Sequence, residues 1–111
     1  MDERIIRLIK SFEKNGWRLI GPIDIKGDWW FQDIIMLQSS WRPVGKKLYL
    51  TLLTDPMESK KKIVWCISIS SILPEYNNYR SISQITLNDV KSTDLETFVK
   101  LINQTVLKCE N

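Results

Sequence analysis

Side chains that commonly do chemistry are scarce in this chain of 111 residues. It contains no histidine, which removes the commonest general acid–base and the commonest metal ligand of proteins. The two cysteines, Cys66 and Cys109, lie far apart and match no zinc motif. The glycines are isolated, so the sequence offers no glycine-rich phosphate loop. These residue types predict no cofactor, no metal site and no activated nucleophile.

Carboxylates are the remaining candidates for catalysis. Asp24, Asp28, Asp55 and Glu58 fall in predicted turns, which an antiparallel meander would bring to one end of its sheet. A metal site or an acid–base pair would be one use of them, but acids that form turns and face water are more ordinary. We therefore expect no catalytic activity, and an enzyme of unrecognised type is the alternative.

Asp33 differs from these acids because it interrupts an apolar predicted strand. A charge in such a position needs a partner or water. The strand pairing expected below places Arg18 diagonally across from Asp33, within reach of a long side chain. A structural ion pair is one interpretation, and a charge that sets specificity inside an interface is the other.

A predicted loop combines basic residues with an aromatic one: Trp41, Arg42, Lys46 and Lys47. Cations beside an exposed aromatic ring can hold a phosphate backbone and stack a base. A loop that only keeps the protein in solution has the same composition, and a net charge of +3 is mild for a nucleic-acid binder. Weak binding of nucleic acid or another polyanion is therefore an alternative function.

Composition indicates a single domain over 1–111. Hydrophobic residues make up 43% of the chain and charged residues 26%, as in globular proteins with one core. No apolar run reaches the roughly 18 residues of a membrane span, and the acidic N-terminus lacks the pattern of a signal peptide. Two cysteines make no disulfide framework, so we expect free thiols in a reducing, cytoplasmic setting.

Amphipathic helices are predicted near both ends of the chain. Over 3–15, apolar residues repeat at helical spacing, at Ile5, Leu8, Ile9 and Phe12. Over 93–108, Thr93 and Glu96 have the spacing of a capping box that begins a helix.

Between these helices, runs rich in β-branched and aromatic residues predict strands. The runs are 17–25, 29–38, 47–54 and 63–70, and a short fifth strand at 85–87 is an alternative. Residues 29–38 also fit a helical spacing, but turn signals on both sides favour a strand. The expected fold class is α+β: an antiparallel meander of four, alternatively five, strands with both helices packed on one face.

Turn positions suggest how these strands pair. They place Leu19 opposite Ile34, Leu37 opposite Tyr49, and Leu52 opposite Trp65. With this register, the face toward the helices collects an apolar core. Its expected members include Trp17, Leu19, Ile34, Met36, Leu50, Leu52 and Ile67.

The opposite, outer face of the expected sheet is too apolar for a face left in water. Its members include Trp29, Phe31, Ile35, Tyr49 and Leu53, with Asp33 and Arg18 as polar elements. Such a patch usually marks an interaction site. We therefore expect a small non-catalytic protein-interaction module, resembling adaptor or immunity proteins in size and style and most simply a homodimer. A register shifted by one, or residues 71–91 folded over this face, would explain the patch differently.

Overall fold

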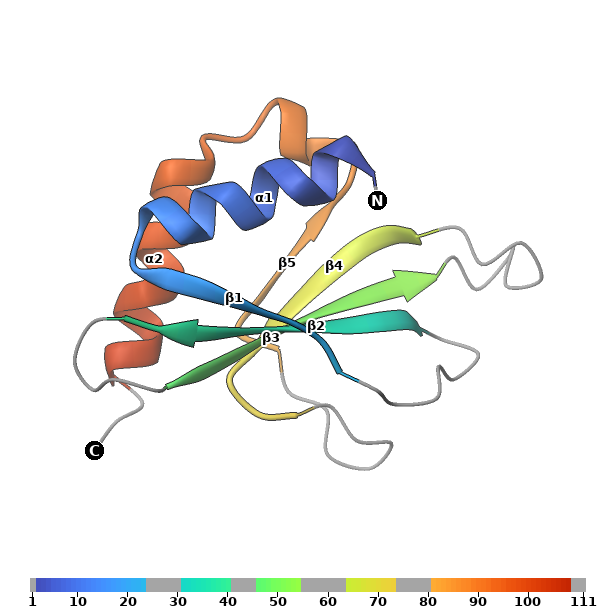
Figure 1. The fold of residues 1–111 in the computed structure, drawn as a ribbon. Coiled ribbons are helices and arrows are strands. Elements are labelled where there is room, and N and C mark those ends of the chain that lie inside the picture. The colour runs from blue at the N-terminus through green and yellow to red at the C-terminus, as the bar shows by residue number, and fades with distance from the viewer. Residues whose placement is uncertain (1, 24–30, 41–45, 55–63, 74–80, 109–111) are drawn as a thin grey trace.

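A meander sheet with helices on one side organises the chain (Figure 1). The computed structural model describes residues 2–23, 31–40, 46–54, 64–73 and 81–108. Within these ranges the sheet has five antiparallel strands in the order β1-β2-β3-β4-β5. The predicted α+β meander is therefore confirmed, and the fifth strand, which was the alternative, is present.

The elements lie close to their predicted ranges. The helices are α1, Glu3–Lys14, and α2, Leu95–Lys108, with the 3-10 helix η2, Asp89–Lys91, before α2. The strands are β1, Trp17–Pro22; β2, Phe31–Ser39; β3, Lys47–Thr54; β4, Val64–Ser70; and β5, Ser83–Thr86. The run that also fitted a helix is strand β2, because β1 and β3 pair with its backbone on both sides.

Helix α1 has a side-chain cap at its start and a glycine after its end. Asp2 Oδ1 accepts a hydrogen bond from the backbone N–H of Arg4 at 2.8 Å, and Asp2 Oδ2 accepts one from Arg4 Nη2 at 2.8 Å. Gly16 follows the helix with φ 94°, a left-handed conformation that glycine adopts without strain. The Asp2 cap begins the helix, and Gly16 ends it where its apolar spacing stops.

Helix α2 is capped by a residue that the capping-box pattern did not select. Asp94 Oδ1 accepts from the backbone N–H of Thr97 at 3.3 Å, and its Oδ2 accepts from the Thr97 hydroxyl at 2.8 Å. The carboxylate of Glu96 instead lies 3.7 Å from Lys100 Nζ. The cap is thus Asp94 rather than Thr93, and the helix begins at Leu95.

The main core lies between the sheet and the helices α1 and α2. Its buried side chains include Leu8, Phe12, Trp17, Leu37, Leu50, Ile67, Ile69, Val99 and Ile102. Trp17 joins β1 to α2, because its indole Nε1 donates to Asn103 Oδ1 at 2.6 Å. Asn103 Nδ2 in turn donates to the backbone carbonyl of Asn15 at 3.1 Å. Side chains from both ends of the chain therefore meet in one core.

Strand pairing differs from the predicted register. Leu19 lies opposite Leu37, and Leu37 lies opposite Leu48 rather than Tyr49. Both shifts are odd, so β2 presents the opposite set of side chains to the helices. The register between β3 and β4 is shifted by an even number of residues, with Leu52 opposite Ile67. The side chains of these two strands therefore stay on the faces that were predicted.

Bulges and connection lengths explain the shifted pairing. The register was counted from tight turns, whereas β1 ends at Pro22 and β2 begins at Phe31. The pairing also slips between Leu19 and Gly21, and between Phe31 and Asp33. Each bulge adds a residue to one strand and reverses the alternation beyond it, which turn signals do not reveal.

Leu50→Ala tests the core at the centre of β3. Leu50 is fully buried, so the substitution should lower the free energy of unfolding by about 2–5 kcal/mol. Leu101→Ala is the matched control, because Leu101 is 58% exposed on α2 and should change this free energy by less than about 0.5 kcal/mol. Urea unfolding of both variants measures the difference, and equal effects would contradict this core.

Acid should weaken the cap of α1. The hydrogen bonds from Arg4 lower the pKa of Asp2 from 3.8 to about 2. Because the folded-state pKa lies below the unfolded one, the contribution of Asp2 is complete above about pH 4 and is lost as the pH falls through about 2. Unfolding measured across this window should show a smaller acid loss for Asp2→Asn than for the wild type. Identical pH profiles would contradict this role.

Candidate functional site

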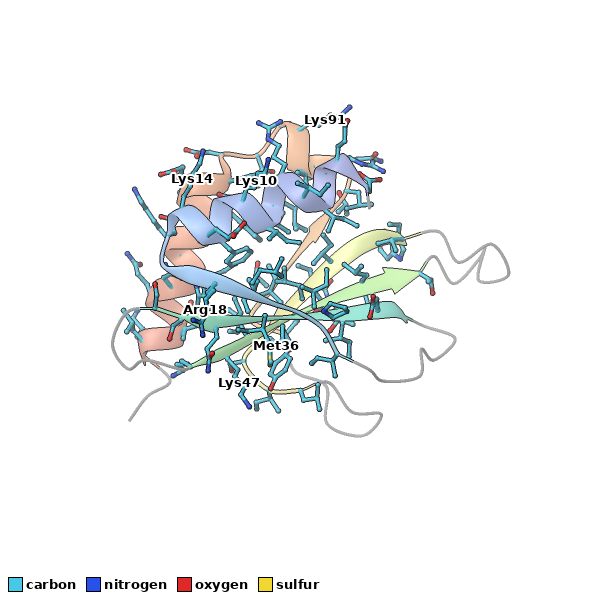
Figure 2. The ribbon with its side chains drawn as sticks, viewed as in Figure 1. Lys10, Lys14, Arg18, Met36, Lys47 and Lys91 are labelled. Atoms are coloured by element: carbon cyan, nitrogen blue, oxygen red, sulfur yellow. The ribbon has the colours of Figure 1, made fainter. Side chains whose placement is uncertain are left out.

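The outer face of the sheet carries a small apolar cluster. Ile34 and Tyr49 form its centre, and Ile23, Met36, Leu53 and Leu73 pack against them. Met36 lies on the side of the sheet away from α1 (Figure 2). Ile34 is 1% exposed and Tyr49 9%. The centre of this cluster is therefore already buried within one copy of the chain.

Residues predicted to share the outer face lie on both sides of the sheet. Tyr49, Leu53 and Arg18 are on the outer face. Ile35 and Asp33 instead face the helices, which corrects their predicted placement and follows from the shifted register of β2. Trp29 lies outside the described residues, and of Phe31 only the backbone is described, opposite Leu53.

Arg18 and Asp33 do not form the ion pair considered from the sequence. Arg18 Nη2 donates to Gln38 Oε1 at 3.1 Å on the outer face. Asp33 Oδ1 accepts from the backbone N–H of Ile34 at 2.9 Å, and its side chain lies on the helix side. The structural ion pair is wrong, and a role in specificity stays as the other interpretation of Asp33.

Part of the segment 71–91 extends the sheet. Strand β5 pairs along the edge of β4, with Ile85 opposite Ile67. Val90 in η2 belongs to the main core, whereas Leu73 contacts the outer cluster. The described part of this segment therefore contributes side chains to both faces of the sheet and adds a strand at its edge. Residues 74–80 lie outside the described ranges.

The loop predicted to bind anions is described only at its end. Lys46 Nζ donates to the backbone carbonyl of Val106 at 3.1 Å, near the C-terminus of α2. A cation is favourable at the carbonyl end of a helix, which gives Lys46 a structural role. Lys47 is exposed, and Trp41 and Arg42 lie outside the described residues.

Metal-binding groups do not gather within the described part of the chain, where no three acidic or cysteine side chains could together hold an ion. The turn acids Asp24, Asp28, Asp55 and Glu58 lie outside that part. Cys66 is a buried free thiol, and burial raises its pKa. A higher pKa keeps less of the thiol in the reactive thiolate form, so Cys66 has the character of a core residue.

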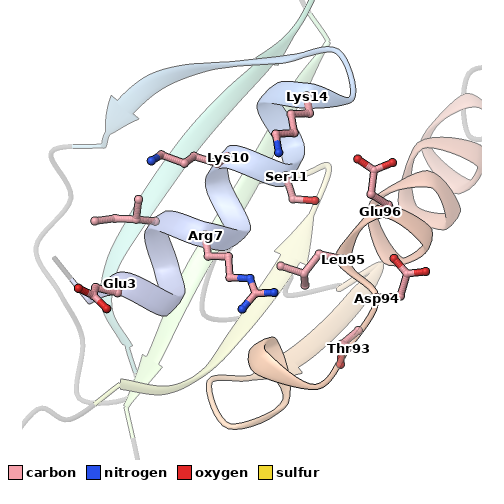
Figure 3. A pocket seen from close by; sticks show the side chains of 10 residues that line it. Glu3, Arg7, Lys10, Ser11, Lys14, Thr93, Asp94, Leu95 and Glu96 are labelled. Atoms are coloured by element: carbon pink, nitrogen blue, oxygen red, sulfur yellow. The ribbon is translucent and has the colours of Figure 1, made fainter.

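A groove between α1 and the start of α2 has charged walls (Figure 3). It encloses about 630 Å³ and is lined by Arg7 and Lys14 on one side and by Asp94 and Glu96 on the other. Arg7 points toward the start of α2, and Lys10 points away from it. Asp94 is engaged in the helix cap and Glu96 lies near Lys100. Charges of both signs give this groove no clear preference for a polyanion.

An apolar groove between α1 and the β1 side of the sheet was missed by the sequence analysis. It encloses about 220 Å³, and its lining is Ile6, Ile9, Lys10, Glu13, Leu19, Gly21, Pro22, Asp33 and Ile35. Sites for small molecules usually enclose about 300–1,000 Å³. The groove is therefore better matched to one or two side chains of another polypeptide than to a cofactor.

A signal for this groove is present in the sequence. Ile6 does not fit the helical spacing that buries Ile5 and Ile9, and it is 37% exposed. Leu19 and Ile20 are neighbours in one strand, so regular alternation cannot direct both into the same core. They are 43% and 45% exposed. In the groove lining, Ile6 is thus the apolar residue that lies outside the expected periodicity.

Strand β1 forms an open edge of the sheet beside this groove, since β2 is its neighbour among the described strands. The carbonyl of Gly16 accepts from the N–H of Ser40 at 2.8 Å, which makes them a hydrogen-bonded pair. Along antiparallel strands, hydrogen-bonded pairs alternate with non-hydrogen-bonded pairs. Counting from Gly16 and Ser40, the pair of Leu19 and Leu37 is a non-hydrogen-bonded one. The N–H and C=O of Leu19 therefore point away from β2.

No protein-family model, curated protein or solved structure matches this chain. Among the described residues, no helix is long and apolar enough to cross a membrane. Function must therefore be inferred from the surfaces of the described residues, among which the α1–β1 groove has a mostly apolar lining.

Tyr49→Ala distinguishes an intramolecular cluster from an interface on the outer face. Because Tyr49 is buried against Ile34, the substitution should lower the free energy of unfolding by about 2–5 kcal/mol. Gln84→Ala, at an exposed position on the same face, should change it by less than about 0.5 kcal/mol. Denaturant unfolding measures stability and sedimentation measures molar mass. A stable Tyr49→Ala chain with a reduced molar mass would instead identify an interface.

Proposed function

We propose that this chain is a small, non-catalytic protein-interaction module. Its contact surface is the apolar groove between α1 and β1 together with the open edge of β1. One observation carries the proposal: the groove and the outward-facing backbone of Leu19 lie side by side. Exposed apolar side chains beside an open strand edge are features that protein partners bury.

The chemistry of the groove supports binding rather than catalysis. The chain has no histidine, and the ionisable side chains in this groove are Lys10, Glu13 and Asp33. The rest of its lining is aliphatic side chains, Gly21 and Pro22, which suit packing against another apolar surface. A reducing, cytoplasmic setting is part of the proposal, and the free thiol of Cys66 supports it.

The surface proposed here differs from the one expected from the sequence. The outer face gives less support to a homodimer, because Ile34 and Tyr49 are buried within one chain. A second copy bound at the α1–β1 surface would still be a module of this kind. Polyanion binding has little support. Of the four residues predicted for it, the structure describes Lys46 and Lys47, and Lys46 donates a hydrogen bond to the carbonyl of Val106. Lys47 is exposed.

Photo-crosslinking tests this proposal in the cells that make the protein. A photoreactive amino acid placed at Leu19 should give one adduct of reproducible mass, because this position lies in the proposed contact surface. The matched control is the same amino acid at Leu107, which is 47% exposed on α2. That position should give no such adduct.

A second substitution shows whether the adduct depends on the groove. Ile6→Lys places a charge in the apolar lining and should reduce adduct formation from position 19 at least tenfold, since a buried unpaired charge opposes binding. Circular dichroism checks that the variant remains folded. The absence of any adduct at position 19, or equal adducts at both positions, would contradict the proposal.

A further inference from the structure

The α1–β1 surface has the features of a site for an extended peptide. Resting on the proposed function, we infer that a partner segment adds to β1 as a further strand. We also infer that it places an apolar side chain in the groove and basic side chains near Asp33 and Glu13. The hydrogen-bonding edge, the shape of the groove and its charges each support one part of this inference.

The backbone of β1 selects an extended segment. The N–H and C=O of Leu19 point toward the open edge, as the pairing of Gly16 with Ser40 requires. A partner residue in the β conformation would donate to one of these groups and accept from the other. A partner helix has its own backbone groups already bonded and would leave those of Leu19 without partners.

The groove selects an apolar side chain at the residue opposite Leu19. Directly paired residues project from the same face of a sheet, and the side chain of Leu19 lies on the face toward α1. The partner side chain would therefore pack against Leu19 and Ile6. About 220 Å³ of space accommodates one such side chain with part of a neighbour.

Irregularities in β1 limit the length of the added strand. The pairing with β2 slips between Leu19 and Gly21, and Pro22 has no N–H to donate. A bulge bends the strand, so regular pairing does not continue far beyond it. The added strand is therefore a short partner segment centred on Leu19, and pairing with Leu19 sets the register of that segment.

Charge at the groove favours a basic partner. Two carboxylates, Glu13 and Asp33, line it together with one ammonium group, Lys10. Asp33 is half-buried, and its hydrogen bond within the described residues comes from the backbone N–H of Ile34. A partly desolvated carboxylate is stabilised by a cation that donates to its remaining lone pairs. In a strand, residues two apart share a face, so lysine or arginine two residues from the apolar anchor would face the groove.

Capped heptapeptides test this inference with the full chain. The main probe has leucine at its fourth position, lysine at its second and sixth, and threonine elsewhere. Its sequence reads the same in both directions, so it serves for parallel and antiparallel pairing. A second peptide replaces both lysines with glutamate, a third replaces leucine with alanine, and a fourth carries N-methyl groups on its central residues.

Amide spectra of the isotope-labelled chain report where each peptide binds. The lysine peptide should shift the resonances of Leu19, Asp33 and the facing part of α1. The glutamate and alanine peptides should bind at least about tenfold more weakly, and N-methylation should abolish binding because it removes the backbone donors.

Charge variants of the chain test the role of Asp33. Asp33→Asn should reduce the preference for lysine over glutamate at least threefold. Glu96→Gln removes the same charge from the other side of α1 and should leave the preference unchanged. Binding that ignores peptide charge, survives N-methylation, or shifts residues away from β1 and α1 would overturn the inference.

These outcomes separate the inference from the proposed function. An adduct at position 19 without binding of the lysine peptide would overturn strand addition and leave the interaction module in place. Failure of both experiments would remove both conclusions.

Discussion

The pairing of β2 with its two neighbours determines which side chains each face of the sheet presents. A strand has two faces, and one residue of slip exchanges them. With Leu37 opposite Leu48, strand β2 gives Ile35 and Leu37 to the core under α1 and gives Ile34 to the outer face. The same pairing carries Asp33 to the helix side, where it lines the apolar groove. With the predicted register, Asp33 would lie diagonally across from Arg18 on the outer face, and Glu13 would be the one carboxylate left in the groove lining.

Two kinds of apolar surface remain after the core is filled, and their burial separates them. On the outer face, Ile34 and Tyr49 are almost inaccessible to water, so this cluster acts as a second, smaller core. At the β1 edge, Ile6, Leu19 and Ile20 keep more than a third of their surface exposed. Apolar groups contribute to association only with area that is still in water before binding. The β1 edge therefore has more to gain from a partner than the aromatic-rich face that composition first suggested.

The sequence predicted element types and order well because each depends on neighbouring residues. Ile5, Leu8, Ile9 and Phe12 identify α1 by their spacing, and Gly16 marks its end. Which residues lie across a hairpin depends on the lengths of connections and on bulges, and local patterns do not report either. The face of the β2 residues from Asp33 to Leu37 was consequently exchanged, and with it the expected site. Leu19 was assigned to the core although it is exposed. Alternation predicts which face of the sheet a side chain points to, but it does not predict whether a helix covers that part of the face.

The bond between Trp17 and Asn103 has a consequence for the order of folding during synthesis. Trp17 begins the first strand, whereas Asn103 belongs to the last helix. The ribosome makes the first hairpin before it makes α2, so the hydrogen bond between Trp17 and Asn103 forms only after α2 has been made. The same helix brings an amide donor to the carbonyl of Asn15, next to the turn between α1 and β1. The turn between α1 and β1 thus reaches its final packing only after α2 has been made.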